Sequence, residues 1–153
     1  MPGSLRDQCA IVGIGETDFS KDSGRSELQL ACEAIRAALE DAGLEVGDID
    51  GIVRYEMDSN QEIALVSALG VKNLRYFGQI GYGGSAHCAV VGHAASAIVA
   101  GLAEVVVCFR AANERSGVRF GLPIPKWEPG VDGIQAFTAP FGMLSPVHRF
   151  GMF

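Results

Sequence analysis

Blocks of apolar and polar positions alternate along the chain, and their periods predict strands and helices in turn. A short apolar run at 9–14 leads into Gly13 and Gly15, which predicts a buried, central strand. The residues 26–29 match a helix capping box, and apolar residues at helical spacing follow until Gly43 (Leu28, Ala31, Ile35, Ala38, Leu39 and Ala42). This segment is predicted to form an amphipathic helix that packs on a sheet.

The same alternation continues to residue 112. Strands are predicted at 49–55, 74–80 and 104–110, a short helix at 60–69 that ends at Gly70, and a longer helix at 85–100. The longer helix contains no Asp, Glu, Lys or Arg, and small or apolar residues occupy each of its faces, so we expect it to be buried on all sides. Strands that alternate with helices predict an α/β fold with a mainly parallel sheet.

The character of the chain changes after residue 112. Gly and Pro recur at short intervals from 113 to 153, and Trp127, the only tryptophan, lies there. We therefore expect a βαβαβ core at 1–112 and the start of a long loop region at 113–153, which is functional or forms an interface. Phe137, Phe141 and Trp127 are candidates to cover a dimer interface. The aromatic C-terminal segment suggests that these 153 residues are part of a longer enzyme.

Charge and cysteine usage exclude several classes of function. The formal net charge is −6 and no cluster of Lys and Arg is present, which argues against nucleic acid or an anionic membrane as a partner. No signal peptide and no membrane-spanning helix are expected, which predicts a cytoplasmic protein. Cys9, Cys32, Cys88 and Cys108 lie in apolar segments and are predicted to be buried and reduced. The absence of a C-x-x-C pair or a histidine cluster predicts no metal site.

A glycine-rich turn joins the strand at 74–80 to the helix at 85–100. Its glycines (Gly78, Gly81, Gly83 and Gly84) would let a thioester or a pantetheine arm approach the backbone, and the first N–H groups of the helix could face an enolate oxygen. The alternative is a tight turn with no role in binding, in which Ser85 caps the helix. His87 either lines a pocket or bonds a neighbouring carbonyl group, whereas His93 is expected to be packed in the core.

Dinucleotide binding is not predicted. Gly13 and Gly15 resemble the start of a dinucleotide-binding loop, but Asp18 stands where the third glycine belongs, and the next helix begins too late.

Four segments together resemble one enzyme superfamily. They are residues 10–19, 37–44, 48–51 and the Ala-Gly-Leu-Ala-Glu run at 100–104. The order of these parts is similar to that of the thiolase superfamily, most closely its lipid-transfer-protein (sterol carrier protein X) branch. The resemblance covers nearly the whole chain but only the N-terminal part of such an enzyme. It implies a thiolase-like layered α/β fold with a buried central helix.

In thiolases a nucleophilic cysteine precedes the glycine-rich helix, where the helix dipole and N–H groups lower the pKa of the thiol. Counting back from Ala100 without gaps puts this position at Gly84. A glycine cannot form an acyl-enzyme, so thiolysis by the usual route is not expected. Cys88 would replace the missing thiol only if the register slipped by four residues.

The missing cysteine makes the chain most similar to the lipid-transfer-protein aldolases of bacterial steroid degradation. This resemblance implies retro-aldol cleavage of a β-hydroxyacyl-CoA into a ketone and a shorter acyl-CoA. The catalytic tyrosines of that family would lie beyond residue 153, so none of Tyr55, Tyr76 and Tyr82 is assigned that role. The expected substrate-binding residues are Tyr82, Gly83, Gly84, Ser85, His87 and His148. His148 falls, with Met143, Ser145 and Pro146, where thiolase-like enzymes fold a loop over the acyl-CoA, although it is equally compatible with a solvated loop.

The resemblance also implies partners. A steroid-CoA thioester is the expected substrate, no bound cofactor is expected, and the family forms dimers and works with an OB-fold partner found in hydratase subunits. Two alternatives stay open: an acetyl-CoA acetyltransferase that uses Cys88, and a non-catalytic subunit that binds lipid or acyl-CoA.

Overall fold

The computed structural model describes residues 5–56, 58–81, 84–115, 137–143 and 151. The chain divides into two compact units, Met1–Asn113 and Glu114–Phe153. The described part of the second unit contains a short 3-10 helix, η2 (Ala139–Phe141). Phe137 and Phe141 expose 76% and 79% of their surface, so both leave apolar area uncovered within this chain. Their expected place in a dimer interface stays a prediction.

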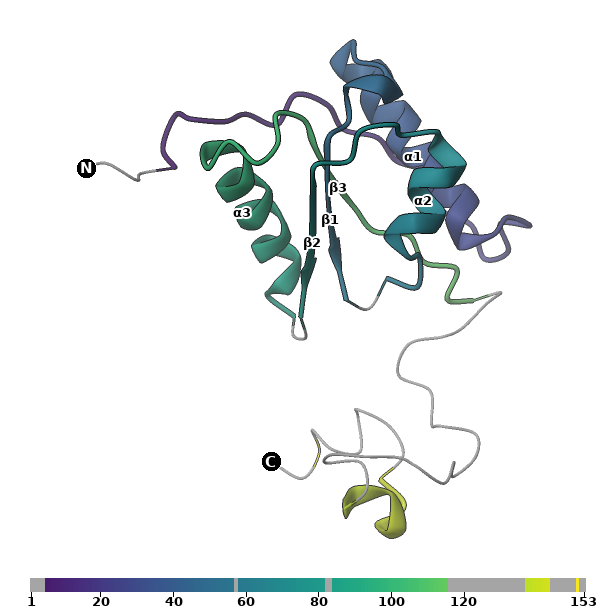
Figure 1. Ribbon diagram of the computed structural model, residues 1–153. Coiled ribbons are helices and arrows are strands. Elements are labelled where there is room, and N and C mark those ends of the chain that lie inside the picture. Colours follow the sequence, from purple (N-terminus) through teal and green to yellow (C-terminus); the bar gives the residue numbers. More distant parts are fainter. Residues whose placement is uncertain (1–4, 57, 82–83, 116–136, 144–150, 152–153) are drawn as a thin grey trace. The chain divides into compact units, whose positions relative to one another are not determined.

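A parallel three-stranded sheet forms the centre of the first unit. Its strands are β1 (Gly51–Tyr55), β2 (Tyr76–Ile80) and β3 (Val106–Phe109), in the order β2-β1-β3. Gly51 is in register with Tyr76 on one side and with Val106 on the other. These strands confirm the predictions at 49–55, 74–80 and 104–110. The carboxyl ends of all three strands therefore meet at one edge of the sheet (Figure 1).

Helices cover both faces of this sheet. Figure 1 shows α1 (Glu27–Ala42) and α2 (Glu62–Leu69) on one side and α3 (Ala86–Val99) on the other. Successive residues of a strand point to opposite faces. Ile52 accordingly packs with α1 and α2, whereas Val53 and Tyr55 pack with α3. The predicted layered α/β arrangement is confirmed.

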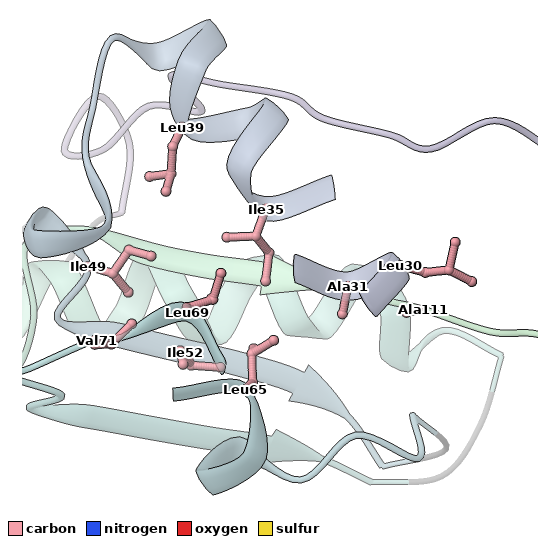
Figure 2. Close-up of a cluster of buried hydrophobic side chains, with 10 residues drawn as sticks. All are labelled: Leu30, Ala31, Ile35, Leu39, Ile49, Ile52, Leu65, Leu69, Val71 and Ala111. Carbon is pink, nitrogen blue, oxygen red and sulfur yellow. The ribbon is translucent and has the colours of Figure 1, made fainter. Parts of the chain in front are cut away.

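The larger of two apolar clusters lies between the sheet and the helices α1 and α2. Figure 2 shows its ten buried residues, among which Ile49, Ile52 and Leu65 are at most 1% exposed. A short 3-10 helix, η1 (Val46–Asp48), brings Ile49 from the end of α1 to the start of β1. Burial of these side chains supplies most of the free energy that holds α1 and α2 on the sheet.

Local signals in the sequence set the ends of α1 and α2. The Ser26 hydroxyl accepts a hydrogen bond from the Gln29 N–H at 3.1 Å, as expected of an N-cap. The Gln29 side chain instead donates to Glu33 at 2.8 Å, so this pairing does not complete a reciprocal capping box. Gly43 and Gly70 end the two helices at φ of 68° and 83°, values that glycine adopts without strain.

Asp50 ties the amino ends of two strands together. Its carboxylate accepts hydrogen bonds from the N–H groups of Glu104, at 2.9 Å, and Val105, at 2.8 Å. Arg75 forms an ion pair with the same carboxylate at 3.2 Å and also donates to the Gly101 carbonyl oxygen. One side chain thus joins the segments 48–51 and 100–104, two of those that carry the resemblance.

The predicted strand at 9–14 is wrong for this chain. The segment is extended but belongs to no sheet, and Ile11, Val12 and Ile14 are 64–76% exposed. It lies along α1 instead: a Cβ on Gly13 or on Gly15 would come within 2.2 Å of a carbonyl oxygen of that helix. The Ile14 N–H also donates to Asp41 at 2.9 Å. The apolar run lacks a neighbouring strand among the described residues, so its alternate side chains remain outside the core.

The prediction that the helix at 85–100 is buried on all sides is also wrong for this chain. Only one stripe of α3 is buried (Ala86, Val90, Ala94 and Ala97). His93 is exposed rather than packed in the core. Of the four cysteines, all of which are free, Cys9, Cys88 and Cys108 are exposed and Cys32 is half-buried, contrary to the prediction that they are buried. A helix can be covered on every face only when protein lies on every side of it, and among the described residues the sheet covers one face of α3.

Within the described residues, no helix has the length and apolar character required to cross a membrane.

Candidate functional site

Gly84 lies in the turn between β2 and α3, at the carboxyl edge of the sheet. Its φ is outside the left-handed region, and a Cβ built on it would meet no atom of the described residues within 4 Å. Neither backbone strain nor a steric clash therefore requires glycine here. The open space beside Gly84 is available to a ligand or to another part of the protein.

Ser85 occupies the N-cap position of α3 but does not cap the helix with its side chain. Its φ and ψ are −79° and −9°, and its hydroxyl makes no cap hydrogen bond, so the prediction of a side-chain cap is wrong. The Ser85 carbonyl oxygen accepts from the N–H groups of Cys88 and Ala89, which begins the helical pattern. The exposed Ser85 hydroxyl is left at the mouth of the helix.

His87 lies in the first turn of α3 and contacts two other groups of the site. Its Nδ1 is 3.4 Å from the Gly84 carbonyl oxygen, a long contact that is a hydrogen bond only when Nδ1 carries a proton to donate. Its ring centroid is 4.3 Å from that of Tyr55, with an angle of 47° between the planes. The imidazole thus satisfies the expected contact with a neighbouring carbonyl while one side of it remains exposed.

Tyr55 and Arg110 complete this group from two different strands. Tyr55 ends β1 and is 5% exposed, and Arg110 directly follows β3. The Arg110 guanidinium carbon lies 5.7 Å from the centroid of the Tyr55 ring, within the range of a cation–π interaction. A cation, a phenol and an imidazole therefore lie together where the carboxyl ends of β1 and β3 meet the first turn of α3.

A buried carboxylate fixes the chain beneath this group. Asp58 is 3% exposed, and its Oδ2 accepts from the Ala111 N–H at 2.7 Å while its Oδ1 accepts from the backbone and side-chain amides of Asn60. The Asp58 N–H donates to the Tyr55 carbonyl oxygen at 2.9 Å. Arg54 donates to the Asp58 carbonyl oxygen at 2.7 Å. Asp58 therefore connects Tyr55 to Ala111, the residue that follows Arg110.

The thiols near the sheet differ in their surroundings. Burial of the Cys108 thiol raises its pKa to about 11, even though much of the residue is exposed. The same thiol donates to the Val90 carbonyl oxygen of α3 at 3.9 Å. Burial also raises the pKa of Cys32, an effect that the charge of Arg36 opposes. A nucleophilic cysteine needs a lowered pKa, so neither thiol is activated. Cys88 is exposed in the first turn of α3.

Three of the predicted substrate-binding residues, Tyr82, Gly83 and His148, lie outside the described residues, as do Trp127, Ser145 and Pro146. The other three, Gly84, Ser85 and His87, lie together at the start of α3. Across the described part of the chain, no group of three or more His, Cys, Asp or Glu side chains is arranged to hold a metal ion.

Sequence reasoning missed Tyr55, Asp58 and Arg110 as members of this site. A signal was available: each lies at, or just after, the carboxyl end of a predicted strand, at 49–55 or at 104–110. In parallel α/β sheets, ligands bind outside the carboxyl ends of the strands. That rule brings these positions together with the glycine-rich turn.

Comparison with curated proteins finds two similar enzymes. The chain is 49% identical, over its whole length, to a steroid side-chain-cleaving aldolase of Thermomonospora curvata, and 50% identical, over 97% of its length, to a 17-hydroxy-3-oxo-4-pregnene-20-carboxyl-CoA lyase of Mycobacterium tuberculosis. In both cases it spans 39% of the relative's length. No protein-family model matches the chain.

Comparison with solved structures agrees with the resemblance seen in the sequence. An Ltp2-ChsH2(DUF35) aldolase matches 94% of the chain with a TM-score of 0.78 and 48% identity, and the match covers 36% of that protein. A monomeric SCP2-thiolase-like protein of Mycobacterium smegmatis matches 64% of the chain with a TM-score of 0.54 and 26% identity, over 22% of its own length. The fold is thiolase-like, and the predicted similarity to steroid side-chain-cleaving aldolases is confirmed.

Proposed function

We propose that this chain is the N-terminal portion of a thiolase-fold lyase that cleaves a β-hydroxyacyl-CoA of a steroid side chain into a ketone and a shorter acyl-CoA. The observation that carries the proposal is identity of 49% and 50% to two enzymes named as a steroid aldolase and a steroid-CoA lyase. Gly84 supports it, because a glycine at the position expected for the thiolase nucleophile leaves no thiol to form an acyl-enzyme.

Retro-aldol chemistry requires no covalent intermediate. A base removes the proton of the β-hydroxyl group, the bond between the α and β carbons breaks, and the β carbon becomes the carbonyl carbon of the ketone. The bonding electron pair moves into the thioester, which becomes an enolate and then takes a proton at its α carbon. The protein must therefore supply a base, an acid and hydrogen-bond donors for the enolate oxygen.

This chain supplies one wall of the reaction site in our proposal. The first N–H groups of α3 lack partners within the helix and can face the enolate oxygen. The space beside Gly84 receives the reacting carbons, and Ser85 and His87 contact the substrate. Tyr82, Gly83 and His148 are assigned to substrate binding from the sequence. The base and the acid belong to the part of the protein that follows residue 153.

Partners are proposed on the same basis. We expect a CoA thioester to bind as substrate without a resident cofactor, and the protein to act in the cytoplasm as a homodimer. The solved aldolase similar to this chain is named as a complex of Ltp2 with ChsH2(DUF35). A DUF35-type subunit is accordingly the partner we propose, in agreement with the OB-fold partner expected from the sequence.

One observation favours a second candidate function. Cys88 is exposed in the first turn of α3, whereas the sequence predicted a buried thiol. A thiol at that place could serve an acetyl-CoA acetyltransferase that works by thiolysis. Such an enzyme consumes free CoA, because the CoA thiol releases the acyl group from the enzyme.

The two reactions separate in one assay. The full-length protein, together with its DUF35-type partner, is incubated with 17-hydroxy-3-oxo-4-pregnene-20-carboxyl-CoA, with and without free CoA, and the products are followed by liquid chromatography and mass spectrometry. We expect a 17-ketosteroid and propionyl-CoA in equal amounts, without a need for free CoA and equally with Cys88→Ser. Cleavage that depends on both free CoA and Cys88 would favour the acetyltransferase. Binding without any cleavage would favour a non-catalytic subunit.

A further inference from the structure

Tyr55 and Arg110, which have no role in the proposed reaction so far, form a group with His87. The ring centroids of His87 and Tyr55 are 4.3 Å apart. The guanidinium carbon of Arg110 is 5.7 Å from the centroid of the same Tyr55 ring. Tyr55 is buried, whereas His87 and Arg110 are exposed. A buried ring that contacts two exposed polar side chains at the carboxyl edge of a parallel sheet is suited to hold those side chains in place for a ligand.

The backbone beneath the group restricts its movement. Asp58 holds the Tyr55 carbonyl oxygen through its N–H and the Ala111 N–H through its carboxylate. Arg54 extends the network to β2, because it donates to Gln79 at 2.7 Å. All three strands are therefore linked at their carboxyl ends, and the positions of Tyr55 and Arg110 are set by buried hydrogen bonds rather than by a loose loop.

The contact of His87 with Gly84 favours the tautomer in which Nε2 can accept a hydrogen bond from a ligand. Nδ1 lies 3.4 Å from the Gly84 carbonyl oxygen, and a carbonyl can only accept a hydrogen bond. When Nδ1 carries the proton and donates to Gly84, Nε2 on the other side of the ring keeps its lone pair. The exposed imidazole then presents a hydrogen-bond acceptor in the first turn of α3.

We propose that His87 binds the β-hydroxyl group of the substrate through Nε2, and that Tyr55 and Arg110 are positioning residues that hold the imidazole in this orientation. The inference rests on the proposed function, since a β-hydroxyacyl thioester is the substrate of that reaction. It makes the group a determinant of specificity. A thioester that lacks the hydroxyl leaves Nε2 without a donor, so the protein distinguishes hydroxylated from unhydroxylated side chains before any bond breaks.

A binding experiment tests the inference without relying on turnover. Dissociation constants of the full-length protein are measured by rapid mixing, before cleavage proceeds, for 17-hydroxy-3-oxo-4-pregnene-20-carboxyl-CoA and for the same thioester without its 17-hydroxyl group. We expect His87→Ala to weaken binding of the hydroxylated thioester about five- to tenfold, as for one neutral hydrogen bond, and to leave the other unchanged. His87→Gln places an amide oxygen near the position of Nε2 and should recover part of the loss.

Control variants separate positioning from stability. His93→Ala removes an exposed histidine from the same helix and should change neither dissociation constant. Arg110→Ala should give part of the loss seen with His87→Ala, because its guanidinium group contacts the Tyr55 ring. Histidine ¹⁵N chemical shifts report the tautomer, and a proton on Nδ1 of His87 is expected.

The outcomes are distinct. If His87→Ala weakened both thioesters equally, or neither, the inference would be overturned while the proposed function stood. A proton on Nε2 in the free protein would likewise contradict it. Failure of the wild type to bind either thioester would overturn the proposed function, and this inference with it.

Discussion

Replacement of Asp50 by Ala should destabilise the fold more than is usual for a residue near the protein surface. The carboxylate is 13% exposed and accepts from two backbone N–H groups at 2.8 and 2.9 Å, besides its ion pair with Arg75 at 3.2 Å. A hydrogen bond to a charged group contributes about 1.5–3 kcal/mol. Glu104 is exposed, so water can replace the carboxylate at its N–H group and recover part of that energy.

We therefore expect Asp50→Ala to lower the free energy of unfolding by about 2–3 kcal/mol. For a chain of this size, each kcal/mol shifts the melting temperature by about 2–4 °C, so the total should be roughly 5–10 °C. Circular dichroism during urea and thermal unfolding measures both quantities. Asp50→Asn keeps one acceptor oxygen and should lose about half as much.

Arg75→Ala is the matched control for this prediction. It removes the ion pair and the bond to the Gly101 carbonyl oxygen and leaves the two hydrogen bonds from backbone N–H groups to Asp50. Because Arg75 is 44% exposed, its loss should cost no more than about 1 kcal/mol. If Arg75→Ala and Asp50→Ala had equal effects, the stabilisation would come from the ion pair, and the structural role assigned to the backbone bonds would be wrong.

Three further predictions concern other parts of the fold. Gly51→Ala should lower stability by about 1–3 kcal/mol, because the new Cβ would lie 2.7 Å from a methyl group of Val106; in a double-mutant cycle, Val106→Ala should remove most of this effect, and simple additivity would contradict the reasoning. Cys108 should react with iodoacetamide at pH 8 about tenfold more slowly than a thiol of the ordinary pKa of 9.0. Its raised pKa of about 11 lowers the fraction of thiolate, and the greater nucleophilicity of a more basic thiolate offsets part of that loss. Its rate, followed by mass spectrometry, should still be rising at pH 10, and a plateau near pH 9 would show that burial does not raise the pKa. Ser26→Ala should cost about 1 kcal/mol through loss of the α1 cap, measured by urea unfolding, while Ser26→Asp should keep the wild-type stability.

Signals that act over a few residues predicted much of the fold. The hydroxyl of Ser26 and the glycines at 43 and 70 set the ends of α1 and α2 by local hydrogen bonds and backbone conformation, so the sequence alone places them well. The alternation of apolar runs also predicted the parallel sheet. These features depend little on what surrounds them.

Burial could not be predicted in the same way, because it depends on which other elements are present. The apolar segment at 9–14 and the uncharged helix α3 have compositions typical of a protein interior, yet Ile11 and His93 are exposed here. The site shows a similar limit. Gly84 and His87 were found from a local motif, whereas Asp58 and Arg110 join them only through the order of the strands, which periodicity does not give.

The central place of β1 has a consequence for how the chain folds. Both partners of β1 come later in the chain, and Gly51 must wait for Tyr76 and then Val106 before its hydrogen bonds are complete. The described strands pair in parallel, so neither pairing can form through a short hairpin. Each pairing instead closes a long loop and gives the slow kinetics of high contact order. During synthesis, α1 can complete its packing only after β3 has left the ribosome, because α1 contacts β3 as well as α2. The Asp50 contacts with Glu104 and Val105 also form at this last stage, so their loss should speed unfolding more than it slows folding.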